Sequence, residues 1–165
     1  MSEYLQRLWD TTGKIFLAVS SGGAALSSPS GGGARFLEML AAVPASLEVI
    51  LAVICGNDFF NGHFAVRAYD IAWEVAASDL CHAMRAKSRQ QFTMVGASAA
   101  TWQYKYASDV MQRYDSNARR LSSHFVACGV PSVTGAAELL GVKISDGSGH
   151  IMPTSKAIVF SALDE

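Results

Sequence analysis

Apolar side chains return at helical spacing through most of the chain between His63 and Cys128. This stretch of 66 residues contains no proline and only one glycine, Gly96. Proline and glycine are the residues that most often interrupt a helix, so their scarcity favours long helical segments. The pattern predicts either one very long helix or two long helices that meet near residues 85–91.

The most regular part of the pattern lies in the second half of this stretch. Its apolar positions are Phe92, Val95, Ala99, Trp102, Tyr106, Val110, Tyr114, Ala118, Leu121 and Phe125. Their mean spacing is about 3.7 residues, which is close to the eleven-residue repeat of a nearly straight helix and longer than the 3.5 of a left-handed coiled coil. We therefore expect a helix here, but not a leucine zipper.

A single helix over residues 63–128 would be far longer than a compact domain of this size. At 1.5 Å per residue it would extend roughly 100 Å, and one copy of it could not cover its own apolar side. The sequence therefore predicts either a hairpin that turns at residues 85–91 or a homo-oligomer. Residues 85–91 lack the usual turn residues, which favours continuity and assembly. The expected oligomer interface is formed by Phe92, Val95, Trp102, Tyr106, Val110, Tyr114, Leu121 and Phe125.

The remaining segments divide by composition. Residues 1–19 fit an N-terminal amphipathic helix, and residues 20–34 form a Gly/Ser-rich tract typical of a linker. A helical core is expected over 35–130, and residues 131–165 form a C-terminal mixed segment with short strands at 142–145 and 157–160. The predicted fold class is mainly α, with a long central helix or helical hairpin, shorter N-terminal helices and a small C-terminal β element.

Within the helical core, residues 36–55 combine high apolarity with few charges. A helix is expected over Arg35–Val43, and a second one is expected after Pro44, because proline favours the first turn of a helix. Its apolar face, Leu47, Ile50, Leu51 and Ile54, is a candidate membrane segment. The favourable transfer of its apolar side chains nearly cancels the cost of Glu48, so both a buried core hairpin and conditional membrane contact stay open.

Composition limits the partners and the compartment. Only 16% of the residues are charged, against about 25% in a typical soluble protein, and the net charge is −1. The absence of a basic excess makes nucleic acid an unlikely partner except non-specifically. Three scattered cysteines argue against a disulfide framework, and the N-terminus does not have the pattern of a secretory signal. The expected location is a virion or the host cytoplasm.

The chain offers few arrangements that could carry chemistry. Cys81 and His82 are adjacent and point about 100° apart on a helix, and His124 with Cys128 at i, i+4 could supply only two metal ligands. The two pairs are too far apart to share an ion in either helical arrangement. The glycine tract before Arg35 lacks the Gly-Lys-Ser/Thr ending of a phosphate-binding loop. No cofactor and no metal are therefore expected, and Arg85, Lys87 and Arg89 are the candidate contacts for a phosphate or an acidic partner.

These observations favour a non-enzymatic protein that assembles through long helices, either as a homo-oligomer or with other subunits of a larger structure. The most plausible setting is a bacteriophage virion, as an internal, ejection or head-tail component. A membrane-active pore-forming or holin-like protein that uses residues 36–55 is the first alternative. The second alternative is a small soluble ligand-binding domain or enzyme.

Overall fold

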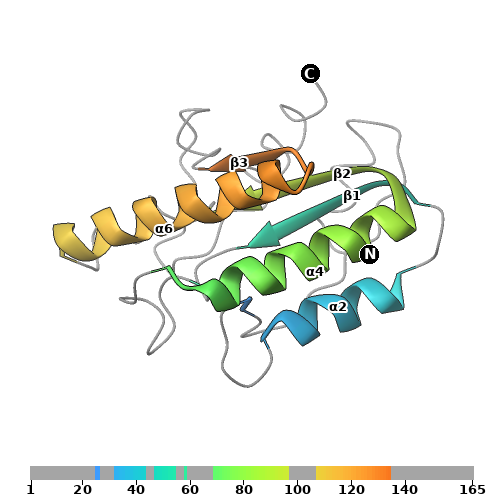
Figure 1. The fold of residues 1–165 in the computed structure, drawn as a ribbon, viewed down its shortest axis with the longest axis horizontal. Helices are drawn as coiled ribbons and strands as arrows, with labels where there is room; N and C mark the ends of the chain where they lie inside the picture. Colours follow the sequence, from blue (N-terminus) through green and yellow to red (C-terminus); the bar gives the residue numbers. More distant parts are fainter. Residues whose placement is uncertain are drawn as a thin grey trace, which may run out of the picture.

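The computed structural model describes residues 25–26, 32–43, 47–54, 58, 69–96 and 107–134. Their elements alternate between helix and strand along the chain (Figure 1). In order they are α2 (Gly32–Ala42), β1 (Leu47–Ile54), α4 (Ile71–Lys87), β2 (Ser88–Val95), α6 (Ser108–Ala127) and β3 (Ser132–Thr134). The predicted helix at 1–19 and the predicted strands at 142–145 and 157–160 lie outside these residues.

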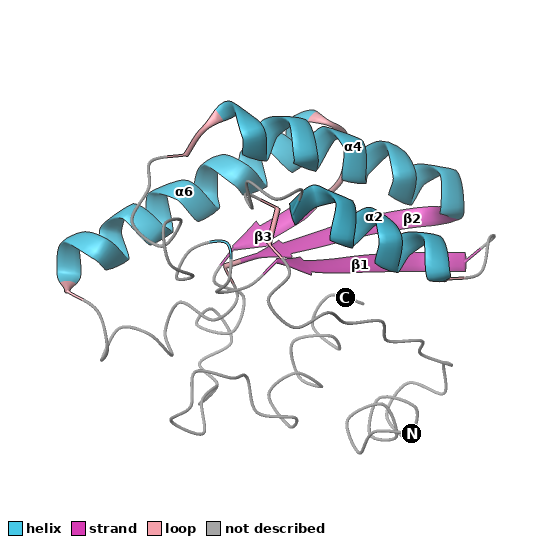
Figure 2. Ribbon diagram, turned by 90° about the horizontal axis from the view of Figure 1, so that it is seen from below, coloured by secondary structure: helices cyan, strands magenta, loops and turns pink. Residues whose placement is uncertain are grey.

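The three strands form one parallel sheet in the order β1-β2-β3. Leu47 pairs with Ser88 and Ile54 with Val95, while Thr93 to Val95 of β2 pair with Ser132 to Thr134 of β3. All three helices pack on the same face of this sheet (Figure 2). This is the arrangement expected when successive parallel strands are added in one direction by crossovers of the same hand.

The predicted fold class is therefore wrong: the described chain is an α/β structure without a long central helix. The stretch predicted as one helix or a hairpin contains α4 and α6 with the strand β2 between them. Phe92 and Val95, which begin the apolar row at helical spacing, belong to β2. The spacing of three residues between Phe92 and Val95 is close to the period of a helix, and for this reason the pattern predicts a helix where the chain forms β2.

The change from α4 to β2 takes place without a loop. Lys87 ends the helix and Ser88 begins the strand, with extended backbone angles of φ −142° and ψ 160°. The Ser88 hydroxyl donates to the carbonyl of Met84 at 3.3 Å, which satisfies one of the last helical carbonyls. The chain reverses its direction between Lys87 and Ser88, because α4 runs antiparallel to the strands (Figure 1). The extended backbone of Ser88 makes this reversal without glycine or proline, so the lack of turn residues at 85–91 did not indicate a continuous helix.

The second predicted helix, after Pro44, is also wrong. Residues 47–54 form β1, the edge strand of the described sheet. Eight consecutive residues, of which seven are apolar and several are β-branched, are typical of a strand in a parallel sheet that packs on both faces. The expected helix over Arg35–Val43, in contrast, corresponds to α2 (Gly32–Ala42).

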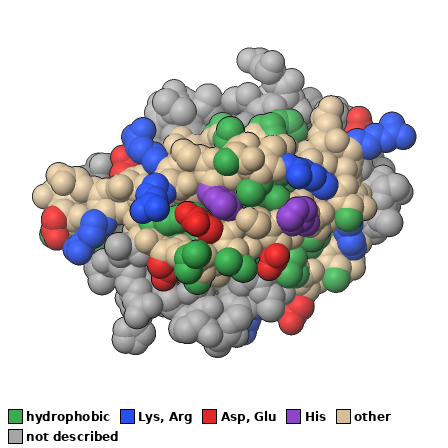
Figure 3. Space-filling model, viewed as in Figure 1, with side chains coloured by type: hydrophobic (Ala, Val, Ile, Leu, Met, Phe, Trp, Pro, Cys, Tyr) green, Lys and Arg blue, Asp and Glu red, His purple; other side chains and the backbone are tan. Residues whose placement is uncertain are grey.

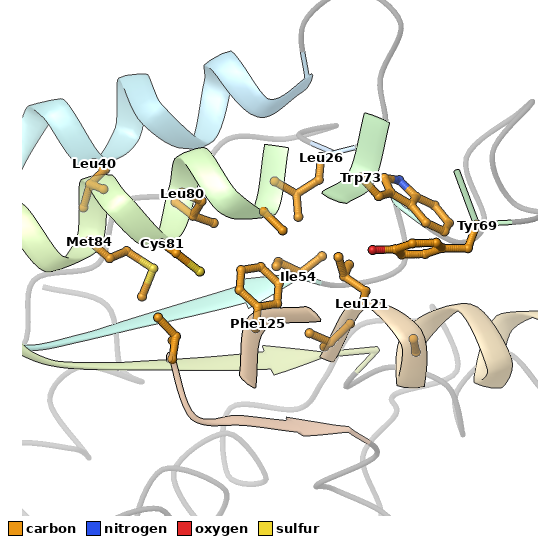
Figure 4. Close-up of a cluster of buried hydrophobic side chains, with 14 of the residues drawn as sticks. Leu26, Leu40, Ile54, Tyr69, Trp73, Leu80, Cys81, Met84, Leu121 and Phe125 are labelled. Atoms are coloured by element: carbon orange, nitrogen blue, oxygen red, sulfur yellow. The ribbon is translucent and has the colours of Figure 1, made fainter. Parts of the chain in front are cut away.

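One hydrophobic core lies between the helices and the sheet (Figure 4). Ile54 from β1, Trp73 and Leu80 from α4, and Leu121 and Phe125 from α6 are buried in it. Leu26, from the tract predicted as a linker, and Leu40 of α2 join the same cluster. The described elements therefore share one core.

Two helix ends are fixed by specific contacts. After α6, Gly129 has φ +79° and donates to the carbonyl of Val126, while Val130 donates to the carbonyl of Phe125 at 3.0 Å. This pair of bonds is a Schellman motif, which favours glycine at the left-handed position. At the end of α2, Lys87 Nζ donates to the carbonyls of Ala41 and Val43 at 3.1 and 2.8 Å. A side chain from α4 therefore completes a helix that lacks a basic residue in its own last turn.

Residues 36–55, which include the candidate membrane segment, are divided between α2 and β1. Ile54 is fully buried in the core, and Ile50 and Leu51 are half-buried. Among the described residues, no helix has the length and apolarity needed to cross a bilayer.

Candidate functional site

The carboxyl ends of the three strands lie along one edge of the sheet because all strand pairs are parallel. The strands end at Ile54, Val95 and Thr134, and the chain leaves this edge to enter α4 and α6 (Figure 1). Ligands of open α/β sheets bind outside the carboxyl ends of the strands, where loops and helix N-termini meet. This edge is therefore the first place to look for a functional site.

An acidic residue is buried at this edge. Asp58 lies four residues beyond the end of β1, and none of its surface is exposed. Burial of a carboxylate is costly unless polar groups surround it. Asp58 therefore places a carboxyl group inside the protein just beyond the end of the first strand. Asp58 was not predicted as a site residue because residues 47–54 were expected to form a helix. An apolar run followed by Gly56, Asn57 and Asp58 is also typical of a strand that ends in a polar loop.

Gly96 closes the end of β2 against α6. Its N–H donates to the carbonyl of Ile54 at 2.8 Å, which joins the ends of the two strands. The residue is buried and has φ +68°. A Cβ atom there would lie 3.0 Å from Cβ of Ala118 and 3.2 Å from Oη of Tyr114. Both the backbone angle and the close approach of α6 therefore require glycine.

Asn117 of α6 holds the segment that enters α4. The Tyr69 N–H donates to Asn117 Oδ1 at 3.0 Å in a buried environment. The next residue, Asp70, caps α4 by accepting from the Ala72 N–H at 3.1 Å. Two helices that are distant in the sequence are thereby positioned relative to each other at the carboxyl edge.

The phenol of Tyr69 is buried between aromatic and cationic groups. Its ring centroid lies 5.1 Å from that of Trp73, and the Arg120 guanidinium lies 4.6 Å from the ring centroid. Burial raises the pKa of Tyr69 to about 12, and the negative charge of Glu74 adds to the effect. Tyr69 is therefore neutral at physiological pH and presents a hydroxyl group. We call Asp58, Tyr69, Gly96, Tyr114 and Asn117 the carboxyl-edge site.

The side chains predicted to form an oligomer interface have several different positions. Val95, Tyr114, Leu121 and Phe125 are buried in the core of the chain itself, whereas Phe92 and Val110 are half-buried. Trp102 and Tyr106 lie outside the described residues. The buried members are covered by the sheet and by α4, so the need for neighbouring subunits no longer follows from this row of residues.

The three basic residues expected to contact a phosphate or an acidic partner have different surroundings. Lys87 caps α2, as described above. The guanidinium of Arg85 lies against Gly129, where a Cβ atom would be 2.5 Å from Nη2. Arg89 is exposed on β2. By contrast, Arg113 pairs with Asp109 at 3.2 Å and Arg119 pairs with Asp115 at 3.3 Å, both at i, i+4 spacing on α6.

A second polar cluster lies between α4 and the end of α6. Ser78 Oγ is 3.0 Å from His124 Nε2 and 3.7 Å from Cys128 Sγ. His124 Nε2 and Cys128 Sγ are 3.6 Å apart, and Cys81 lies one turn after Ser78 on the same side of α4. We call Ser78, Cys81, His124 and Cys128 the thiol cluster.

The thiol cluster differs from the pairs considered in the sequence. Cys81 approaches Cys128 rather than its neighbour His82, and this contact depends on the packing of α4 against α6. Burial raises the pKa of Cys81 to about 12, and the neighbouring Cys128 adds to the increase. Within the described part of the chain, no three His, Cys, Asp or Glu side chains are arranged to hold a metal ion.

Comparison with known proteins found no matching family model and no match among curated proteins or solved structures. The function is therefore inferred from the geometry of this chain alone.

Proposed function

We propose that this chain is a small-ligand-binding α/β domain whose ligand lies at the carboxyl-edge site. This corresponds to the second alternative of the sequence analysis. The observation that carries the proposal is Asp58, a fully buried carboxyl group just beyond the carboxyl end of a parallel strand. Small-ligand sites in proteins combine apolar walls with a few fixed polar groups that orient the ligand.

The chemistry of the site favours a ligand with hydroxyl or amino groups. A carboxyl group has two oxygens that accept hydrogen bonds, so Asp58 has the capacity to accept donors from a ligand in addition to its contacts within the protein. Gly96, Tyr114 and Asn117 support the site from β2 and α6, where close packing fixes their positions. The ligand class that we propose is therefore a small polyhydroxylated or amino compound.

Substitution of Asp58 tests the proposal. A panel of simple sugars, polyols and amino acids is screened by the shift in the melting temperature of the full chain. We expect at least one compound to raise the melting temperature of the wild-type protein and to have no such effect on Asp58→Asn. Asp79→Asn, which makes the same chemical change at an exposed position of α4, is the matched control and is expected to respond like the wild type.

Hydrogen exchange of the wild-type protein with the same compound provides a second measurement that does not depend on a variant. The proposal requires protection of amides near Ile54, Asp58 and Gly96. It fails if no compound in the panel stabilises the chain, if Asp58→Asn responds as strongly as Asp79→Asn, or if the protected amides lie only at the opposite edge of the sheet.

Self-assembly as a virion component remains a second proposal, now based on a different surface. On the outer face of the helices, Ile71, Val75 and Val126 are 74%, 56% and 55% exposed. Apolar side chains on this face lie beside histidine and acidic side chains (Figure 3). Exposed apolar groups together with low overall charge favour contact with another protein surface.

Light scattering of the full chain tests this second proposal. An assembly that uses this surface has a native mass above the 17.6 kDa of one chain and loses that mass when Ile71 and Val75 are both changed to Ser. A monomeric wild-type chain at working concentration would contradict self-assembly through this surface.

A further inference from the structure

Two thiols that are 47 positions apart in the sequence meet where α4 contacts the end of α6. Cys81 lies one turn after Ser78 on α4, so the two side chains project from the same side of the helix. Cys128, at the C-cap of α6, contacts Ser78 at 3.7 Å and lies near enough to Cys81 to raise the pKa of that thiol. The meeting of the thiols therefore follows from the packing of these two helices.

The two cysteines differ in access to solvent. Cys81 is 1% exposed and projects into the core near Phe125 (Figure 4). Cys128 is half-buried and is reachable from the surface. Because the pKa of Cys81 is raised to about 12, its thiol stays protonated at neutral pH and reacts slowly with oxidants. An oxidant from solution therefore meets Cys128 first.

His124 is positioned to assist the reaction of Cys128. Its Nε2 lies 3.6 Å from Cys128 Sγ and 3.0 Å from Ser78 Oγ, so Nε2 can accept the thiol proton and, once protonated, donate a hydrogen bond to the Ser78 oxygen. The negative end of the α6 dipole acts in the opposite direction, because it disfavours a thiolate at the C-cap. The expected reaction is therefore slower than that of a dedicated peroxide-reducing enzyme.

We propose that Cys128 and Cys81 are an oxidant-responsive pair, in which hydrogen peroxide converts Cys128 to a sulfenic acid that then forms a disulfide with Cys81. In the first step the Cys128 sulfur attacks one peroxide oxygen, the O–O bond breaks, and water leaves. In the second step the Cys81 sulfur attacks the sulfenic sulfur, and the hydroxyl group leaves as water with the Cys81 proton. Two thiols and one peroxide thus give one disulfide and two waters, and a dithiol reductant reverses the oxidation.

The disulfide would fix α4 to the end of α6 and close a loop that contains β2 and all of α6. A cross-link over a loop of this length restricts the unfolded chain, so oxidation is expected to raise the melting temperature by about 5 °C or more. This inference does not depend on a ligand at the carboxyl-edge site, which lies at the other end of the crossover helices.

Peroxide titration of the full chain tests the proposal. Reduced protein has three titratable thiols after denaturation, Cys55, Cys81 and Cys128. After treatment with a small molar excess of hydrogen peroxide we expect one free thiol, assigned by peptide mapping to Cys55, and a linked peptide pair that contains Cys81 and Cys128. Incubation with a dithiol restores all three thiols.

Three variants separate this pair from general oxidation. Cys55→Ser is expected to form the same linked peptides, whereas Cys128→Ser is expected to form none. His124→Ala is expected to give the same product more slowly, by about tenfold, because the proton acceptor is lost. The wild-type peptide map decides the question even if a variant fails to fold. Retention of three free thiols, or a disulfide that includes Cys55, would overturn the proposal.

Discussion

At the scale of single residues, Gly96 and Gly129 have similar backbone angles but different surroundings. Both have positive φ, at +68° and +79°. The Cβ of an alanine at Gly96 would meet Ala118 and the ring of Tyr114, which are fixed in the core, whereas at Gly129 it would meet the flexible end of Arg85. The cost of the added methyl group therefore depends on whether its neighbour can move.

We accordingly predict that Gly96→Ala destabilises the fold more than Gly129→Ala does. Backbone strain should cost each variant about 1–2 kcal/mol, and overpacking against α6 should add about 1–3 kcal/mol at Gly96 only. Chemical denaturation with urea measures both changes. Equal losses of stability in the two variants would mean that α6 can move away from the end of β2. Such a result would contradict the close packing of Ala118 and Tyr114 against Gly96.

The buried thiol of Cys81 makes stability depend on alkaline pH. Its pKa is raised from 9.0 to about 12, so between these values the unfolded chain loses a proton that the folded chain keeps. Stability is therefore fully present below pH 9 and falls as the pH rises towards 12, by up to about 1.4 kcal/mol per pH unit for one group. Tyr69, raised from 10.0 to about 12, contributes in the same direction above pH 10.

Cys81→Ala separates this contribution from that of other groups. We expect the variant to lose stability less steeply than the wild type between pH 9 and 10, where Tyr69 contributes little. Urea denaturation under reducing conditions at several pH values gives the two slopes. Cys128→Ala is the comparison and is expected to reduce the slope less than Cys81→Ala does, because burial is a larger cause of the raised Cys81 pKa than Cys128 is. Identical slopes for wild type and Cys81→Ala would contradict the burial of the Cys81 thiol.

At the scale of elements, Lys87 couples the end of α4 to the end of α2. Its ammonium group donates to two carbonyls that α2 cannot satisfy internally. The cation also lies at the negative end of that helix, which adds favourable electrostatic energy. A residue at the boundary of one helix therefore stabilises another.

We predict that Lys87→Met destabilises the protein by about 1–2 kcal/mol. Hydrogen exchange is expected to show the largest loss of protection in the last turn of α2, near Ala41 and Val43. Arg89→Met, an exposed position on β2, is the control and is expected to change stability by less than about 0.5 kcal/mol. Unchanged exchange in α2 would show that Lys87 is dispensable as a cap.

The elements also show how far the sequence could be interpreted. The helix over Arg35–Val43 and the apolar face of α6 at Tyr114, Leu121 and Phe125 were predictable, because their spacing is local information. The strand β2 was not, because Phe92 and Val95 are three residues apart and residues 88–91 are polar. Strands in a parallel sheet are stabilised by partners far along the chain, and single-residue propensities do not show this.

The candidate site was less predictable than the fold for the same reason. The contact of Asn117 with Tyr69 and that of Cys128 with Cys81 both join α6 to residues more than 40 positions earlier. Neither pair of residues is part of a recognisable sequence motif, so the sequence alone does not indicate either contact. Only Asp58 had a local signal, a polar turn after an apolar run, and that signal required β1 to be identified as a strand.

At the scale of the whole molecule, the described elements share one core to which both layers contribute. Phe125 is fully buried and belongs to the same cluster as Ile54 of β1 and Leu40 of α2. Such a core is expected to unfold as one cooperative unit.

Phe125→Ala tests this cooperativity. We expect a loss of about 3–5 kcal/mol, as for other large-to-small changes in cores. Hydrogen exchange should then accelerate in α2, α4 and α6 together. Val126→Ala, the adjacent and exposed position, is the control and should have a small effect. Faster exchange confined to α6 would contradict a single core.

The direct passage from Lys87 into Ser88 has a mechanical consequence. The helix α4 and the strand β2 are antiparallel neighbours with no loop residue between them, so the position of one determines the position of the other. An insertion or deletion at this junction would shift the pairing of β2 with β1, because the register from Leu47 to Ile54 depends on the position of Ser88. We therefore expect the boundary between Lys87 and Ser88 to tolerate insertions, new chain termini and proteolytic cleavage least.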